Sequence, residues 1–106
     1  MKIKTSELTG PALDWAVDLA LGGYNPGTLY SSYWAVGGPI IDRELIQTYP
    51  LRKNRKEFEW AAATLPWGDP ATAKQAFGPT PLIAAMRCFV ASKLGDEVDV
   101  PKELLL

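Results

Sequence analysis

Residues 78–101 read GPTPLIAAMRCFVASKLGDEVDVP, and this stretch decides the fold because it delimits one helix from end to end. Thr80 can cap the helix, and Pro81 suits its first turn because the fixed φ of proline is already helical. Gly95 accepts a positive φ and ends the helix, with Lys93 placed to interact favourably with the negative end of the dipole. The pattern predicts a helix that begins at Pro81 and stops before Gly95.

Two sets of side chains divide the surface of this helix. The core stripe is apolar and consists of Leu82, Met86, Phe89 and Val90. The other side carries small residues, which would let another backbone approach closely, namely Ala84, Ala85, Cys88 and Ala91. Arg87 is the one charge in the helix interior. It is either a surface arginine whose head reaches solvent or a carboxylate, or a ligand for an anion in a cleft or at a symmetric interface.

A second helix is predicted near the start of the chain. Thr9 serves as its cap, Pro11 lies in its first turn and Gly22-Gly23 ends it. Its apolar face comprises Leu13, Ala16, Val17 and Ala20, broadened by Trp15 and Leu19. Asp14 and Asp18 are predicted to lie on an exposed stripe, and two carboxylates are too few for a metal site.

Residues 24–38 are rich in glycine and aromatic residues and show no regular periodicity, and Pro39 is predicted to start a short helix through Ile46. That helix would turn Ile40, Ile41, Leu45 and Ile46 inward. Gly37 and Gly38 would then precede a helix, where free backbone N–H groups can hold a phosphate. The favoured alternative is that these glycines let two segments pack closely.

The remaining segments predict a small antiparallel sheet. Residues 47–51 and 57–65 have the alternation of two strands, joined by a basic turn over 52–56. Residues 66–70, which include Trp67, are predicted to form a loop, and residues 71–77 are predicted to hold one or two helical turns. Residues 2–5 are predicted as either an edge strand or a lead-in. Residues 96–101 are predicted as a short acidic extension that pairs Val98 and Val100 with a sheet edge. We expect an α+β fold, a single domain over residues 1–106, with two main helices packed on a short antiparallel sheet.

Composition narrows the function. The 106 residues include no histidine and one cysteine, which excludes imidazole-based hydrolases, most zinc sites and an internal disulfide. The formal net charge of −1 argues against a surface devoted to nucleic acid. Apolar runs are too short for a membrane span. We therefore expect a protein that is not an enzyme, needs no cofactor or metal, and acts by binding.

Three tracts resemble the NinX-like family of small bacteriophage proteins. They are KIKTSELTGPALDWAVDLA, YSSYWAVGGPIIDRE and FGPTPLIAAMRCFVASKLGDEVDVP, in that order along the chain. The resemblance implies a phage origin, a place in the host cytoplasm and an accessory role. It implies no particular reaction.

The first functional hypothesis is sequestration of a small anionic nucleotide signal, without catalysis. Bases stack on aromatic rings, and phosphates take hydrogen bonds from arginine and from backbone N–H groups. The expected ligand-binding residues are Tyr30, Tyr33 and Trp34 for stacking, Gly37 and Gly38 for backbone approach, and Arg43 and Arg87 for phosphate. The small-residue side of the last helix makes a homo-oligomer plausible.

Two alternatives remain open. One is a protein–protein module that modulates a host or phage enzyme, with Trp67 as a candidate contact. The other is an accessory protein for single-stranded nucleic acid, which would use Arg52, Lys53, Arg55 and Lys56. The near-neutral net charge makes nucleic acid the weakest of these partners.

Overall fold

A computed structural model describes residues 1–52, 58–64 and 74–105. The elements in chain order are β1 (Lys2–Lys4), the 3₁₀ turn η1 (Thr5–Glu7), α1 (Gly10–Ala20), α2 (Trp34–Arg43), β2 (Ile46–Arg52), β3 (Phe58–Thr64), β4 (Gln75–Gly78), α3 (Pro81–Leu94), β5 (Glu97–Asp99) and the 3₁₀ turn η3 (Lys102–Leu105). The fold class predicted from the sequence, α+β with antiparallel sheets, is confirmed.

The strands form two antiparallel sheets. β2, β3 and β4 pair in that order, and β1 pairs with β5. The predicted hairpin is confirmed where it is described, with Tyr49 of β2 opposite Ala61 of β3. The predicted pairing of Val98 is confirmed as well, since it lies opposite Ile3 of β1. The basic turn residues Lys53, Arg55 and Lys56, and also Trp67, lie outside the described residues.

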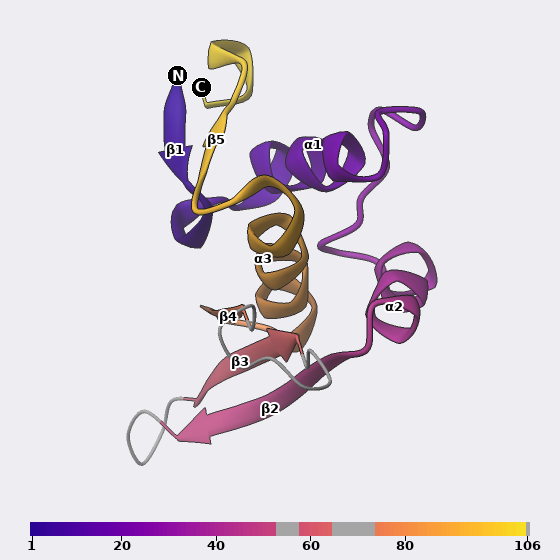
Figure 1. Cartoon of the computed structure of the whole chain (residues 1–106), viewed down its shortest axis with the longest axis vertical. Helices are drawn as coiled ribbons and strands as arrows, with labels where there is room; N and C mark the ends of the chain where they lie inside the picture. Colours follow the sequence, from indigo (N-terminus) through magenta and orange to yellow (C-terminus); the bar gives the residue numbers. More distant parts are fainter. Residues whose placement is uncertain (53–57, 65–73, 106) are drawn as a thin grey trace.

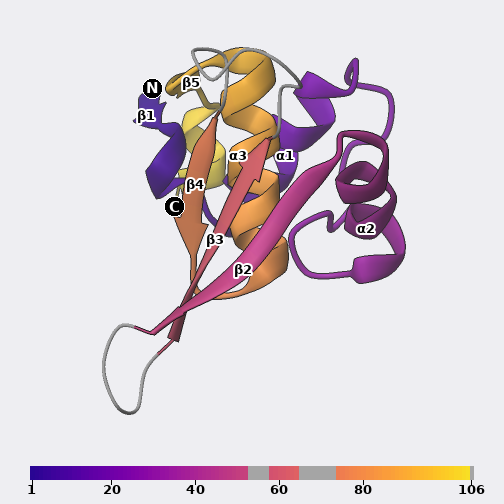
Figure 2. The same cartoon turned by 60° about the horizontal axis from the view of Figure 1, so that its bottom comes forward.

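Helix α3 occupies the centre of the molecule (Figure 1), with the three-stranded sheet on one side of it and α1 on the other (Figure 2). The sheet contacts α3 along β2, β3 and β4, whereas α1 packs against α3 rather than on the sheet. α2 flanks α3 and β2. Of the two main helices that the sequence placed on the sheet, α3 is therefore the one that covers it.

The caps of α3 are those that the sequence predicts. The Thr80 hydroxyl accepts a hydrogen bond from the Ile83 N–H at 3.1 Å, and Gly95 follows the helix with φ of 89°. The small side of α3 is covered within the chain, because its four small residues are all buried. A Cβ added to Gly78 of β4 would lie 2.9 Å from the Ala84 backbone nitrogen. Ala84 is therefore used for close packing with β4, and the burial of these small residues leaves no surface there for a second copy.

The prediction that Asp14 and Asp18 lie on an exposed stripe is wrong. Each side chain is only 7% exposed. Oδ1 of Asp14 accepts a hydrogen bond from the Ser31 N–H at 2.8 Å, and Oδ1 of Asp18 accepts one from the Asn25 N–H at 3.0 Å. The segment after α1 folds back over the helix, and the two carboxylates satisfy its backbone donors.

The apolar face of α1 is otherwise as predicted, apart from Leu19. Leu13, Ala16 and Val17 are fully buried in the core cluster, with Trp15 and Ala20 packed against it. Leu19 is exposed, so it does not broaden this face.

The prediction that a short helix starts at Pro39 is wrong. α2 begins at Trp34 with Tyr33 as its cap, and Pro39 lies inside it. The Gly37 N–H donates to the Tyr33 carbonyl within the helical hydrogen-bond pattern. Ile40 is buried as predicted, but Leu45 follows the helix at a φ of 54° and is exposed.

The helical turns predicted over residues 71–77 are wrong for residues 75–77. Gln75–Gly78 form strand β4, with side chains alternately exposed and buried. The alternation has the period of a strand, and pairing with β3 satisfies the backbone. Residues 65–73 lie outside the described part of the chain.

Candidate functional site

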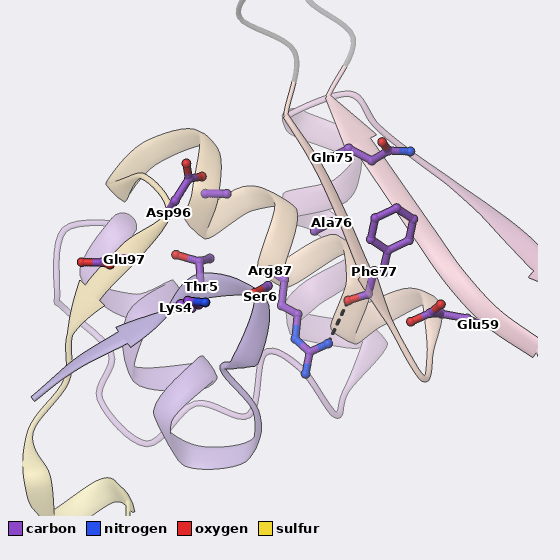
Figure 3. A pocket seen from close by; sticks show the side chains of 11 residues that line it. Lys4, Thr5, Ser6, Glu59, Gln75, Ala76, Phe77, Arg87, Asp96 and Glu97 are labelled. Carbon is purple, nitrogen blue, oxygen red and sulfur yellow. Dashed lines mark hydrogen bonds between the residues drawn. The ribbon is translucent and has the colours of Figure 1, made fainter.

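A cleft with a volume of about 440 Å³ opens between the β1–η1 segment, β4 and α3. Its lining contains five charged residues, Lys4, Glu59, Arg87, Asp96 and Glu97. The other lining residues are Thr5, Ser6, Gln75, Ala76, Phe77 and Ala91. Figure 3 shows them converging from both ends of the chain and from its middle. We call this region the Arg87 cleft.

Arg87 is held in this cleft by two backbone carbonyls. Its Nε donates to the Leu8 carbonyl at 2.7 Å, and its Nη1 donates to the Phe77 carbonyl at 2.8 Å (Figure 3). Burial of the guanidinium lowers the pKa of Arg87, whereas the Glu59 carboxylate acts in the opposite direction. An arginine stays protonated at physiological pH, so the group is a fixed cation whose position is set by the fold.

The guanidinium forms no ion pair with a carboxylate among the described residues. Two carbonyl bonds leave donors of the guanidinium available, since arginine has five N–H groups. Arg87 can therefore offer charge-assisted hydrogen bonds to an anion that enters the cleft. Arg87 therefore lines a cleft, and the partners of its guanidinium are two carbonyls rather than the carboxylate named in the first interpretation.

The charges of the Arg87 cleft are mixed. Lys4 and Arg87 line it together with the carboxylates of Glu59, Asp96 and Glu97. Lys74 lies 3.8 Å from Asp96, which partly balances that carboxylate. This arrangement suits a ligand that has an anionic group at one end and hydrogen-bond donors at another.

Of the seven residues predicted to bind a ligand, only Arg87 lines the cleft. The other six lie on or before α2, namely Tyr30, Tyr33, Trp34, Gly37, Gly38 and Arg43. The structure therefore separates Arg87 from the remainder of the predicted site.

Tyr30 is a core residue. Its side chain is 5% exposed, and its hydroxyl lies 3.3 Å from Oδ1 of Asp18. Burial is the main cause that raises the pKa of Tyr30, and the Asp18 and Asp14 carboxylates add to it, against a hydrogen bond with Thr28 that lowers it. The ring has no free face for stacking with a base.

Tyr33 and Trp34 are exposed, with 60% and 54% of their surfaces accessible. They stand at the N-terminal end of α2, whereas Arg43 is the last residue of that helix. Arg43 lies 4.0 Å from Glu44, a contact at the surface. The two aromatic rings and Arg43 therefore occupy opposite ends of α2.

Gly37 and Gly38 do not form a phosphate cradle, because both lie inside α2 rather than before it. A Cβ on Gly37 would collide with the Tyr30 carbonyl and with the Leu82 side chain. The favoured alternative from the sequence, close packing of two segments, is confirmed at Gly37.

Sequence reasoning missed most of the cleft. The residues that were missed include Lys4, Glu59, Phe77 and Asp96. Lys4 belongs to a segment predicted as an edge strand or a lead-in, and Glu59 to a predicted strand. Phe77 was predicted in a helical turn, and Asp96 in a short acidic extension. The signal that could have found Phe77 is the alternation in Gln75–Gly78. Nothing local in the sequence indicates that residues 4–6 and 96–97 meet β4.

The residues that the structure describes contain no group of three or more potential metal ligands. None of their helices combines the length and apolar character needed to cross a bilayer. Cys88 is buried, and desolvation raises its pKa to about 11.

No curated protein matches the chain. A family model described as bacteriophage P22, NinX matches residues 23–93, about two thirds of the chain. The matched region contains the whole of the second tract that carried the resemblance, residues 30–44, and most of the third, residues 77–101. The first tract, residues 2–20, precedes the matched region. The chain therefore belongs to the bacteriophage P22 NinX family.

Proposed function

We propose that this bacteriophage protein is an accessory factor of the host cytoplasm that binds a small anionic nucleotide and sequesters it without converting it. The binding site in this proposal is the Arg87 cleft, whereas the sequence had suggested residues 30–38 together with Arg43 and Arg87. The observation that carries it is Arg87, a cation fixed by two carbonyls and left without a carboxylate partner among the described residues.

The size and lining of the cleft support a ligand of this class. A volume of about 440 Å³ lies within the range of small-molecule sites. Arg87 and Lys4 can take a phosphate, and the hydroxyls of Thr5 and Ser6 can take further oxygen atoms. Carboxylates such as Glu59 and Asp96 can accept hydrogen bonds from ribose hydroxyls or from the amino group of a base.

Isothermal titration calorimetry against cyclic di- and trinucleotides and cyclic ADP-ribose isomers tests this proposal. We expect one panel member to bind, with at least about tenfold weaker binding for Arg87→Gln, since a charge-assisted hydrogen bond contributes about 1.5–3 kcal/mol. Lys4→Ala is a milder second variant. Arg43→Gln is the matched control, because that arginine lies on α2 and does not line the cleft.

Recovery of the ligand after binding tests the absence of turnover. Mass spectrometry should return the intact molecule after prolonged incubation with purified protein. A product of altered mass would make the protein an enzyme, and a folded protein that binds no panel member would exclude the nucleotide class tested.

A second candidate function rests on a different observation. Tyr33 and Trp34 are adjacent, exposed and aromatic, which is the residue type enriched in the energetic centres of protein interfaces. This favours a protein–protein module that modulates a host or phage enzyme. A stoichiometric partner recovered from infected cells with wild type, and lost with Tyr33→Ala/Trp34→Ala, would support it. Recovery of that partner with both the wild type and the double variant would show that Tyr33 and Trp34 are not the binding surface.

A further inference from the structure

Strand β4 is one edge of its sheet, and its hydrogen-bonding pattern can be determined residue by residue. The Thr64 N–H donates to the Lys74 carbonyl at 2.9 Å, which makes this pair a hydrogen-bonded one. Hydrogen-bonded and non-hydrogen-bonded pairs alternate in an antiparallel ladder. The pairs Ala62–Ala76 and Trp60–Gly78 are therefore bonded as well. It follows that Gln75 and Phe77 direct their N–H and C=O groups away from β3.

These outward groups open into the Arg87 cleft, which Gln75, Ala76 and Phe77 line. The bond from Arg87 Nη1 to the Phe77 carbonyl independently shows the direction of that edge. By that alternation the β3–β4 ladder does not use the Gln75 N–H, the Gln75 C=O or the Phe77 N–H, and outside the ladder no hydrogen bond joins them to the backbone of another described residue. The cleft therefore has one wall made of main-chain donors and an acceptor.

We propose that this edge of β4 reads the base of the bound nucleotide, an inference that rests on the proposed function. Nucleobases present a donor beside an acceptor along their edges. The main-chain groups of Gln75 and Phe77 offer the complementary set. The ligand class is thus a nucleotide whose base hydrogen-bonds to the backbone of β4 while its phosphate binds Arg87.

The surroundings of the edge fit a planar group. A base that continues the sheet beyond β4 would lie over α3, which packs beneath this strand. Ala91 is small and leaves room there, and Arg87 lies one turn before it on the same helix. Guanidinium planes stack well against bases, so Arg87 can support the base and bind the phosphate.

Proline substitution tests a main-chain contact directly. Gln75→Pro removes one outward N–H but leaves the bonded pairs of Ala76 and Gly78, and proline is tolerated on an outward edge position. Gln75→Ala is the matched control, because it removes the side chain and its 2.7 Å bond to the Tyr49 hydroxyl but keeps the N–H. We expect Gln75→Pro to bind the nucleotide about tenfold more weakly than Gln75→Ala does.

Ribose 5-phosphate serves as a probe without a base. It should bind Gln75→Pro and Gln75→Ala equally, and it should bind wild type more weakly than the nucleotide does. Equal nucleotide affinity for the two variants would overturn the inference and leave the proposed function intact. Failure of both probes to bind folded wild-type protein would overturn the proposed function, and the inference with it.

Amide exchange of the wild-type protein gives a measurement that needs no variant. In the free protein the amides of Ala76 and Gly78 should be protected and those of Gln75 and Phe77 should exchange fast. The nucleotide should protect Gln75 and Phe77, whereas ribose 5-phosphate should not. A bound nucleotide that leaves both of these amides unprotected would overturn the inference.

Discussion

The hydroxyl of Tyr30 donates a hydrogen bond across 3.3 Å to Oδ1 of Asp18, and both side chains are buried. The same carboxylate oxygen accepts the Asn25 N–H. Asp18 therefore fixes the segment between α1 and α2 at two points. A residue predicted for stacking is instead part of the core.

Removal of the Tyr30 hydroxyl should lower stability and change its pH dependence. We expect Tyr30→Phe to lose about 1 kcal/mol at neutral pH, the usual net contribution of one hydrogen bond. Because the pKa of Tyr30 is raised above 10.0, the unfolded chain releases this proton first as the pH rises. The associated stability is present below about pH 10 and is lost above it. Urea unfolding at pH 9 and pH 11 should show a smaller fall for Tyr30→Phe, while the exposed Tyr33→Phe should behave as wild type.

Asp14→Ala should destabilise the protein by about 2 kcal/mol, because the buried Ser31 N–H loses its acceptor. Asp42→Ala, at an exposed position of α2, should change stability by no more than about 0.5 kcal/mol. Chemical denaturation of the two variants gives the comparison. Equal midpoints would contradict the role assigned to Asp14.

The two adjacent glycines of α2 should respond in opposite ways to alanine. Gly37→Ala places a methyl group against the Tyr30 carbonyl and Leu82, so we expect a loss of at least about 2 kcal/mol. In Gly38→Ala the new methyl group meets only Trp34, at 3.6 Å, and the helix should gain about 0.5–1 kcal/mol. Thermal unfolding distinguishes these outcomes, and a loss of similar size at both positions would argue against close packing at Gly37.

The caps of α1 and α3 should differ in their contribution. Thr80→Ala removes the hydroxyl that accepts the Ile83 N–H and should cost about 1 kcal/mol. The side chain of Thr9 makes no such bond at the start of α1, so Thr9→Ala should cost less. The test is the difference between the two free energies of unfolding, with Thr9→Ala as the control.

The Cys88 thiol should react with iodoacetamide only when the protein unfolds. Its pKa of about 11 leaves little thiolate at pH 8, and its side chain is buried. Mass spectrometry should show modification in urea and almost none in buffer. Rapid labelling of the folded protein would contradict the burial of this residue.

The sequence predicted the helix ends that depend on neighbouring residues. Thr80, Pro81 and Gly95 defined α3 because caps depend on neighbouring residues. Pro39 misled the prediction of α2, since a proline inside a helix is usually a start or a break, and packing against α3 and β2 outweighs its cost here. The burial of Asp14 and Asp18 could not be predicted, because their hydrogen-bond partners are backbone groups of the segment after α1. That segment comes close to α1 only in the tertiary structure.

The candidate site was predicted only at Arg87. Two interpretations of Arg87 were left open by the sequence, and neither named its partners in the structure, the carbonyls of Leu8 and Phe77, which carry no sequence signal. The tyrosines and glycines of residues 30–38 suggested a second half of the site because of their composition alone. The structure shows that Tyr30 and Gly37 serve the packing of α2.

The guanidinium of Arg87 connects the segment after η1 to β4, because it donates to the Leu8 carbonyl and to the Phe77 carbonyl. These two hydrogen bonds hold the segment after η1 and strand β4 at a fixed separation. Under the proposed function, an anion that enters the cleft would meet a preorganised cation, and its binding would order little of the protein. Binding of that kind would be rapid and would leave the shape of the molecule almost unchanged.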